Sequence, residues 1–153
     1  MKAIAIALGA GLLALPAGAL AQSSIAYETG PCFGTCPVYR VTVRANGRGL
    51  FEGLRHTAVT GQRRFRISPH RYHIYALYLR RLRPASGSVR MDSGPQCQPM
   101  VTDLPSAEVT WTGPGTQSFY YYFGCAPQRH RAIADRLRRA PRLLPIGGFI
   151  GSP

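Results

Sequence analysis

The spacing of the four cysteines limits the folds open to this chain more than any other feature. Cys32 and Cys36 lie four apart around a Gly-Thr turn, and a strand-like run begins directly after them at Val38. Cys97 and Cys125 flank a predicted hairpin, whose antiparallel strands would bring its two ends together. Although four cysteines allow three pairings, we expect the disulfides Cys32–Cys36 and Cys97–Cys125. In an exported chain, which meets an oxidising compartment, an even number of cysteines indicates disulfides.

Residues 1–21 have the pattern of a secretory signal peptide. Met1-Lys2 is a positive n-region, residues 3–15 are apolar, and Ala19-Leu20-Ala21 is an A-x-A cleavage signal. The alternative is a membrane anchor, but the apolar run is shorter than the ~20 residues that a span requires. We therefore expect a periplasmic or extracellular protein that is not an integral membrane protein after cleavage. Residues 22–153 would form one secreted domain, with a core at about 25–140 and an apolar Gly/Pro tail at 141–153 that either packs on the core or extends from it.

Alternation of apolar and polar residues predicts six strands, with Asn46-Gly47 as the turn of the first hairpin. The expected strands are 25–29, 38–44, 50–54, 64–67, 107–112 and 117–123. The Gly- and Pro-containing stretch 85–99 is predicted to be mostly loop.

Two helices are predicted from apolar stripes and from proline and serine at their ends. The first begins at Ser68-Pro69 and stops at Pro84, and the second runs from Pro127 to about Ala140. Their inward stripes are Tyr72, Tyr75, Leu79 and Leu82 in the first, and His130, Ile133, Ala134 and Leu137 in the second. This order of elements predicts an α+β fold, in which one antiparallel sheet built from hairpins carries two helices on one face.

The stretch Pro31–Tyr39, PCFGTCPVY, resembles the C-F-G-T-C-P-x-Y signature of an uncharacterised bacterial family of domains of unknown function. The segment 47–53 is similar to the family's G-x-x-x-Y-E-G hairpin, with Phe51 in place of the usual tyrosine. Gly61, Ile67 and Thr102-Asp103 also fit, so the resemblance covers most of residues 25–140. It implies the fold and export, and it implies no catalytic residues.

Cys32 and Cys36 also allow a thiol-redox or metal-binding interpretation. The pattern C-x-x-x-C-P resembles the copper motif of thioredoxin-fold copper-delivery proteins, in which a helix follows the cysteines and helps to lower their pKa values. Here a strand is predicted to follow, which favours a structural disulfide, and copper or zinc binding is the alternative. His70 and His73 share a helix face, but a metal site needs three or four ligands. We assign no catalytic, cofactor-binding or metal-binding residue, expect no cofactor, and favour a protein that is not an enzyme.

The charge of the chain points to an acidic partner or to a genome rich in GC. The formal net charge is +13, and every cation except Lys2 is an arginine, which binds phosphates and carboxylates in a bidentate manner. A GC-rich genome that encodes surface cations as arginine would give the same composition. The strand 117–123 places Tyr120 and Tyr122 opposite its expected buried aromatic face. We predict a non-enzymatic binding module for an anionic polymer or protein of the cell envelope, not for nucleic acid, with Tyr120, Tyr122, Arg40 and Arg44 as the contact face.

Overall fold

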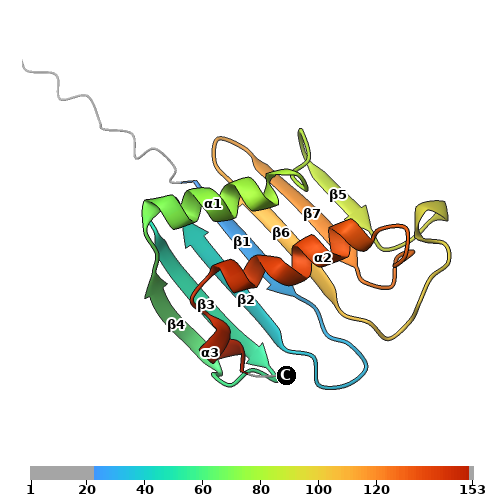
Figure 1. Cartoon of the computed structure of the whole chain (residues 1–153), viewed down its shortest axis with the longest axis horizontal. Coiled ribbons are helices and arrows are strands. Elements are labelled where there is room, and N and C mark those ends of the chain that lie inside the picture. Colours follow the sequence, from blue (N-terminus) through green and yellow to red (C-terminus); the bar gives the residue numbers. More distant parts are fainter. Residues whose placement is uncertain (1–22, 152–153) are drawn as a thin grey trace, which may run out of the picture.

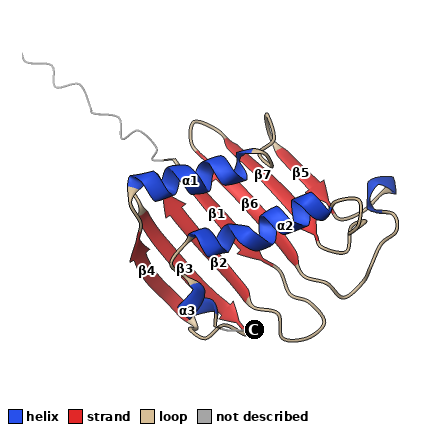
Figure 2. Cartoon of the chain, viewed as in Figure 1, coloured by secondary structure: helices blue, strands red, loops and turns tan. Residues whose placement is uncertain are grey.

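The computed structural model describes residues 23–151, which form a seven-stranded sheet and three α-helices (Figures 1 and 2). The predicted signal peptide lies outside the described residues. The strands are β1 (Ser24–Thr29), β2 (Val38–Arg44), β3 (Arg48–Arg55), β4 (Gly61–Arg66), β5 (Ser88–Met91), β6 (Ser106–Thr112) and β7 (Thr116–Tyr122). The helices are α1 (Pro69–Arg80), α2 (Arg131–Arg139) and α3 (Gly147–Ile150), with short 3-10 turns η1 (Pro95–Cys97) and η2 (Ala140–Leu143).

The strands follow the order β4-β3-β2-β1-β6-β7-β5, and the sheet is mixed. All neighbours are antiparallel except β5, which runs parallel to β7 in the register Ser88↔Ser118 to Met91↔Tyr121. The prediction of a purely antiparallel sheet was therefore wrong, and the stretch 85–99, predicted to be mostly loop, also contains β5 and η1. Three of the four β5 residues are exposed, so this edge strand carries no alternation of apolar and polar residues.

The core lies between the sheet and the helices, which cross one side of it (Figure 1). The α1 helix begins at the predicted point because the Ser68 hydroxyl accepts a hydrogen bond from the Arg71 backbone at 3.2 Å. Tyr75 and Leu79, from its predicted stripe, are fully buried. In the strands, alternate side chains enter this core: β1, β2, β3, β6 and β7 contribute buried residues, and the edge strands β4 and β5 contribute the partly buried Phe65 and Met91.

The second helix begins later than predicted, at Arg131 instead of Pro127. Residues 127–130 form turns, and the preceding Ala126 has a positive φ of 40°, so the chain reorients before the helix can start. The N–H of His130 then donates to the Ala126 carbonyl at 3.0 Å. Ala134 and Leu137 are buried, and the Tyr27 hydroxyl donates to the Leu137 carbonyl at 3.0 Å. This bond ties the central strand β1 to α2.

The C-terminal segment packs on the rest of the molecule. Leu144 and Ile146 are buried, so the core extends past residue 140. The carbonyl of Phe149 accepts a hydrogen bond from the N–H of Val59 at 3.0 Å, and its ring lies 5.5 Å from the ring of Phe51. The α3 turn therefore lies over β3 and holds the loop between β3 and β4.

Both disulfides are present. The loop disulfide, Cys32–Cys36, joins Cα atoms 5.8 Å apart in the segment before β2. The buried disulfide, Cys97–Cys125, joins Cα atoms 4.1 Å apart, and both of its cysteines are fully buried. It connects η1 to the turn that follows β7.

Candidate functional site

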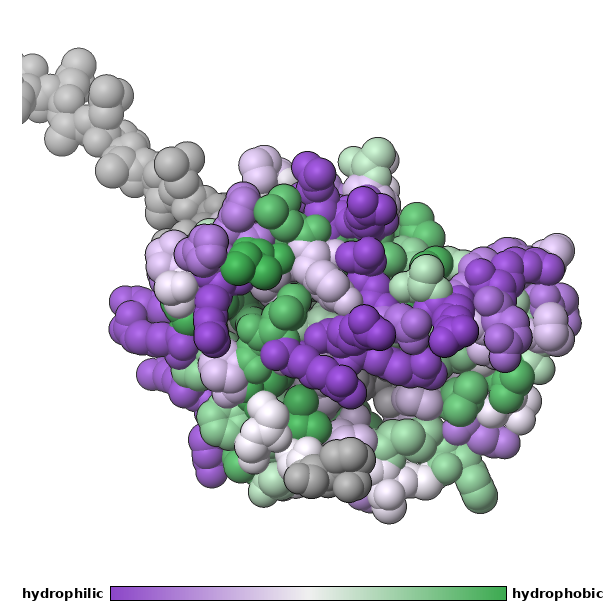
Figure 3. All heavy atoms as spheres, viewed as in Figure 1, coloured by the Kyte–Doolittle hydropathy of each residue, from purple (hydrophilic) through white to green (hydrophobic). Residues whose placement is uncertain are grey.

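The face of the sheet opposite the helices, called here the open face, is covered by polar side chains. The register places one residue from each strand in a transverse row across this face. The members of this polar row, in strand order, are Gln62, Glu52, Arg40, Glu28, Glu108, Tyr120 and Arg90. Figure 3 is drawn from the helix side, where hydrophilic residues gather over α2, so the open face lies on the far side of that view.

The polar row contains one internal ion pair and one hydrogen bond between an amide and a carboxylate. The Arg40 guanidinium donates to the Glu28 carboxylate at 2.7 Å, and this hydrogen bond raises the pKa of Arg40. The Gln62 amide donates to Glu52 at 2.9 Å. At the other end of the row, the Arg90 guanidinium lies 3.9 Å from the centre of the Tyr120 ring. It also donates to Asp92, outside the row, at 2.7 Å, and this bond lowers the pKa of that carboxyl.

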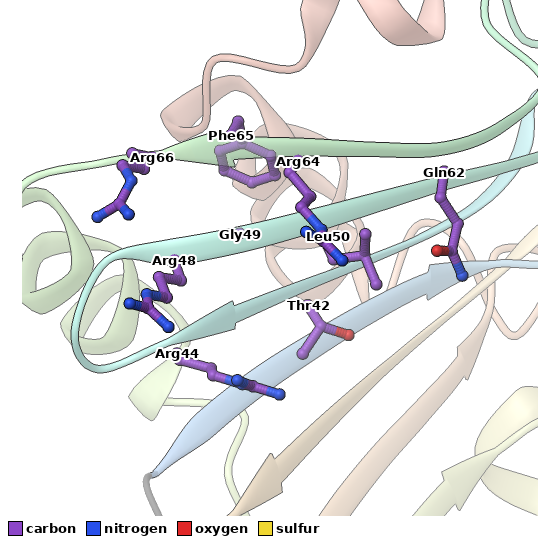
Figure 4. A pocket seen from close by; sticks show the side chains of 9 residues that line it. All are labelled: Thr42, Arg44, Arg48, Gly49, Leu50, Gln62, Arg64, Phe65 and Arg66. Carbon is purple, nitrogen blue, oxygen red and sulfur yellow. The ribbon is translucent and has the colours of Figure 1, made fainter.

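A cleft beside this row is dominated by arginines (Figure 4). It has a volume of about 760 Å³ and lies on β2, β3 and β4. Its lining residues are Thr42, Arg44, Arg48, Gly49, Leu50, Gln62, Arg64, Phe65 and Arg66. We call this site the arginine cleft. All four of its arginines are exposed, and it contains no acidic residue.

The register brings these positive charges close to each other. Arg48 and Arg66 are direct cross-strand partners, which places their Cβ atoms about 4.5–5.5 Å apart. Arg64 lies two residues before Arg66 on the same face of β4. Within residues 23–151 the salt bridges involve only Arg40, Arg90 and Arg131, so none of the four cleft arginines is paired with a carboxylate. Like charges in this arrangement are destabilising until an anion binds.

Four arginines elsewhere in the described chain lie against aromatic rings. On the helix side, Arg136 lies 4.8 Å from the Tyr78 ring and Arg138 lies 4.7 Å from the Phe123 ring. The Arg136 guanidinium also donates to the Tyr78 carbonyl at 2.7 Å, which joins α2 to α1. No such ring contact involves the cleft arginines within residues 23–151. The cleft therefore gathers four guanidinium groups that have neither a carboxylate nor an aromatic partner among the described residues.

The register places all four predicted contact residues on the open face, but they are spread across it. Arg44 lines the arginine cleft, whereas Arg40 is held by Glu28 in the polar row. Tyr120 shares the open face but lies three strands from Arg40, which corresponds to about 14 Å. Tyr122 is half-buried, and its hydroxyl accepts a hydrogen bond from the Leu104 backbone at 3.3 Å.

Sequence reasoning missed Arg48, Arg64 and Arg66 as site residues. The signal available was the alternation of Arg64, Phe65 and Arg66 in an expected strand, which places both arginines on one face. Their proximity to Arg48 depends on the pairing of β3 with β4, and no local pattern in the sequence specifies that register.

A second cavity, of about 260 Å³, lies on the helix side between α1 and the ends of β1 and β6. Trp111 and Arg83 line it, but the Arg83 guanidinium is already bound by the Gln117 side chain at 3.0 Å from its Nε. For metals, residues 23–151 contain no group of three or more His, Cys, Asp or Glu side chains placed to hold an ion. The arginine cleft is thus the stronger candidate.

None of the helices in the described part of the chain is long and apolar enough to cross a bilayer. No curated protein matches the sequence. The profile of the family described as Domain of unknown function (DUF6438) matches residues 23–141, which include all seven strands, α1 and α2. This match confirms the resemblance to a family of unknown function. The chain therefore belongs to the DUF6438 family.

Proposed function

We propose that this protein is an exported, non-enzymatic binding domain that takes up anionic groups of a cell-envelope partner in the arginine cleft. The observation that carries the proposal is the set of four exposed arginines on three adjacent strands without a carboxylate partner among the described residues. Guanidinium groups bind phosphates and carboxylates through paired hydrogen bonds, so several of them on a rigid sheet suit an anionic polymer or an acidic protein segment.

The disulfides also support an exported domain. Two disulfides in a chain of this kind are typical of an oxidising compartment outside the cytoplasm. The alternative, a redox or copper/zinc site at Cys32 and Cys36, has less support because their sulfurs are joined and β2 follows them instead of a helix. Counting free thiols by alkylation and intact mass on protein from an oxidising compartment tests that alternative, since rapid alkylation of both cysteines would favour it.

The binding proposal can be tested by retention on phosphocellulose as a function of salt. Binding through phosphates weakens with salt, and each arginine that contacts a phosphate contributes about 0.7–0.9 to the slope of log affinity against log salt. The double variant Arg48→Gln/Arg66→Gln should therefore elute earlier and with a slope lower by about 1.4–1.8.

The matched control removes the same charge from the helix side. Arg129 and Arg139 are exposed and lie outside the cleft, so Arg129→Gln/Arg139→Gln should change the retention much less. Equal shifts for the two double variants would show that retention depends on net charge alone, and the proposed site would then be abandoned.

A further inference from the structure

The arginine cleft lies next to an unpaired edge of the sheet. Within residues 23–151, the β4 strand is the last in the order and pairs only with β3. The N–H of Ile67 donates to the Gly47 carbonyl at 2.9 Å, so this pair continues the β3–β4 ladder and is hydrogen-bonded. Hydrogen-bonded pairs alternate along an antiparallel ladder, which makes Phe65, Arg63 and Gly61 the residues bonded to β3.

The alternate residues of β4 therefore direct their backbone groups outward. These are Gln62, Arg64 and Arg66, each with one N–H and one carbonyl on the open edge. The Gln62 carbonyl accepts a hydrogen bond from the Arg63 guanidinium at 2.8 Å. This bond is consistent with a carbonyl that points away from β3 and has no partner in the ladder. The side chains of the same three residues line the arginine cleft. Backbone donors and acceptors thus alternate along an edge whose side chains on the open face include two arginines.

On this basis we infer that β4 accepts an extended acidic segment of another protein as an eighth strand, with acidic residues at every second position. A segment paired with β4 would place alternate side chains on the open face, directly opposite Gln62, Arg64 and Arg66. Carboxylates at those positions would meet Arg64 and Arg66 across the new ladder. This inference rests on the proposed function, since it identifies the anionic partner of the same cleft as a polypeptide.

The chain itself does not supply such a segment. It has six acidic residues, and no two of them are two positions apart. Pairing of β4 with β4 of a second copy would bring arginines of both copies together in a chain with a net charge of +13. Charge complementarity therefore selects a different, acidic protein as the occupant. Charges on an edge strand can also serve only to prevent such pairing, which the experiment must distinguish.

The test uses an eight-residue capped peptide that alternates glutamate and threonine, titrated into the intact protein. Binding should slow the hydrogen exchange of the amides of Gln62, Arg64 and Arg66, which receive partners in the new ladder. The same peptide with methyl groups on the glutamate nitrogens keeps its carboxylates but lacks the N–H groups that face β4. It should bind at least about tenfold more weakly, because three hydrogen bonds are lost.

Variants of the protein separate the charge from the backbone. Arg64→Gln should weaken binding of the unmodified peptide about two- to fivefold, as expected for one cross-strand ion pair. Arg139→Gln, at the end of α2, removes the same charge outside the cleft and should change the affinity less than twofold.

Equal affinity for the methylated and unmodified peptides would overturn strand addition. If retention on phosphocellulose still depended on the cleft arginines in that case, the proposed function would remain intact. Loss of both the peptide binding and the cleft-dependent retention would overturn both proposals. A third outcome is that the wild-type protein binds no peptide and the Arg64→Gln/Arg66→Gln variant self-associates. This outcome would show that the arginines only protect the edge from pairing, and it would also overturn the inference.

Discussion

Replacing each of two buried tyrosines by phenylalanine should change stability in opposite directions. The Tyr27 hydroxyl is buried and donates to the Leu137 carbonyl at 3.0 Å. The Tyr75 side chain is fully buried, and its hydroxyl has no hydrogen-bond partner within residues 23–151. The two substitutions remove the same atom, so the difference between them reports the hydrogen bonding of that atom.

The expected magnitudes follow from the partners. Tyr27→Phe loses one buried hydrogen bond, worth about 0.5–1.5 kcal/mol. The Leu137 carbonyl still accepts from the N–H of Ala140, so no unsatisfied acceptor remains and the cost stays in that range. Tyr75→Phe removes an unsatisfied hydroxyl whose burial costs about 1–3 kcal/mol, and this gain is reduced by the dispersion attraction that the oxygen atom provided. We expect a gain of about 1 kcal/mol, and hence a difference of about 2 kcal/mol between the variants.

Urea unfolding with the disulfides intact measures both values. A difference of about 2 kcal/mol corresponds to about 1 M between the two midpoints, provided that the m values are unchanged. Tyr120→Phe, on the open face, is the control and should change the free energy of unfolding by less than about 0.5 kcal/mol. If Tyr75→Phe were destabilised as much as Tyr27→Phe, the Tyr75 hydroxyl would have a partner and the packing described around it would be wrong.

Three other predictions concern the core, the disulfides and the first hairpin. Burial raises the pKa values of Tyr27, Tyr39 and Tyr75, so these side chains stay neutral in the folded protein at a pH where they ionise in the unfolded chain. The free energy of unfolding should therefore be fully retained below about pH 10 and should fall above it, by about 1.4 kcal/mol per pH unit for each tyrosine. Urea unfolding at a series of rising pH values measures this fall. The loop disulfide should be reduced by mild reductant and alkylated before the buried disulfide. Replacing both cysteines of a disulfide by alanine should lower the free energy of unfolding by about 2 kcal/mol for the loop disulfide and by about 3.5 kcal/mol for the buried disulfide. Gly47→Ala should lose more than about 1 kcal/mol in the same assay, because the residue has a φ of 78° and a Cβ atom would lie 2.0 Å from the Ile67 carbonyl oxygen.

The elements that could be predicted are those whose signal is local. Alternation placed β2 and β7, and Ser68-Pro69 placed the start of α1, because each depends on residues within a few positions. By contrast, β5 is exposed and short, and its parallel pairing with β7 depends on the path of the chain between them. The start of α2 was missed because Pro127 satisfies the local rule, while the positive φ of Ala126 sets the following turns.

The site was harder to predict than the fold because it depends on register across strands. Arg44 could be chosen from its exposed position in a strand, but its neighbours in the cleft come from β3 and β4. Arg40 shows the converse case. It was chosen as an exposed cation, but its charge is already neutralised by Glu28, which lies 12 residues earlier on the neighbouring strand. A composition rich in arginine therefore does not locate a binding site until the paired arginines have been separated from the unpaired ones.

The opposed arginines allow a test of whether the cleft is maintained for a ligand. Arg66→Thr removes one member of the Arg48/Arg66 pair and places a residue with high strand propensity in β4. If the pair is repulsive, this variant should be more stable than the wild type by about 0.2–1 kcal/mol near 10 mM salt. The gain should shrink near 1 M salt, where the Debye length falls to about 3 Å. The same variant should elute earlier from phosphocellulose, because stability and binding would place opposite demands on this side chain. A variant that is destabilised to the same extent at both salt concentrations would show that Arg66 contributes to the fold, and the cleft could then no longer be explained by ligand binding.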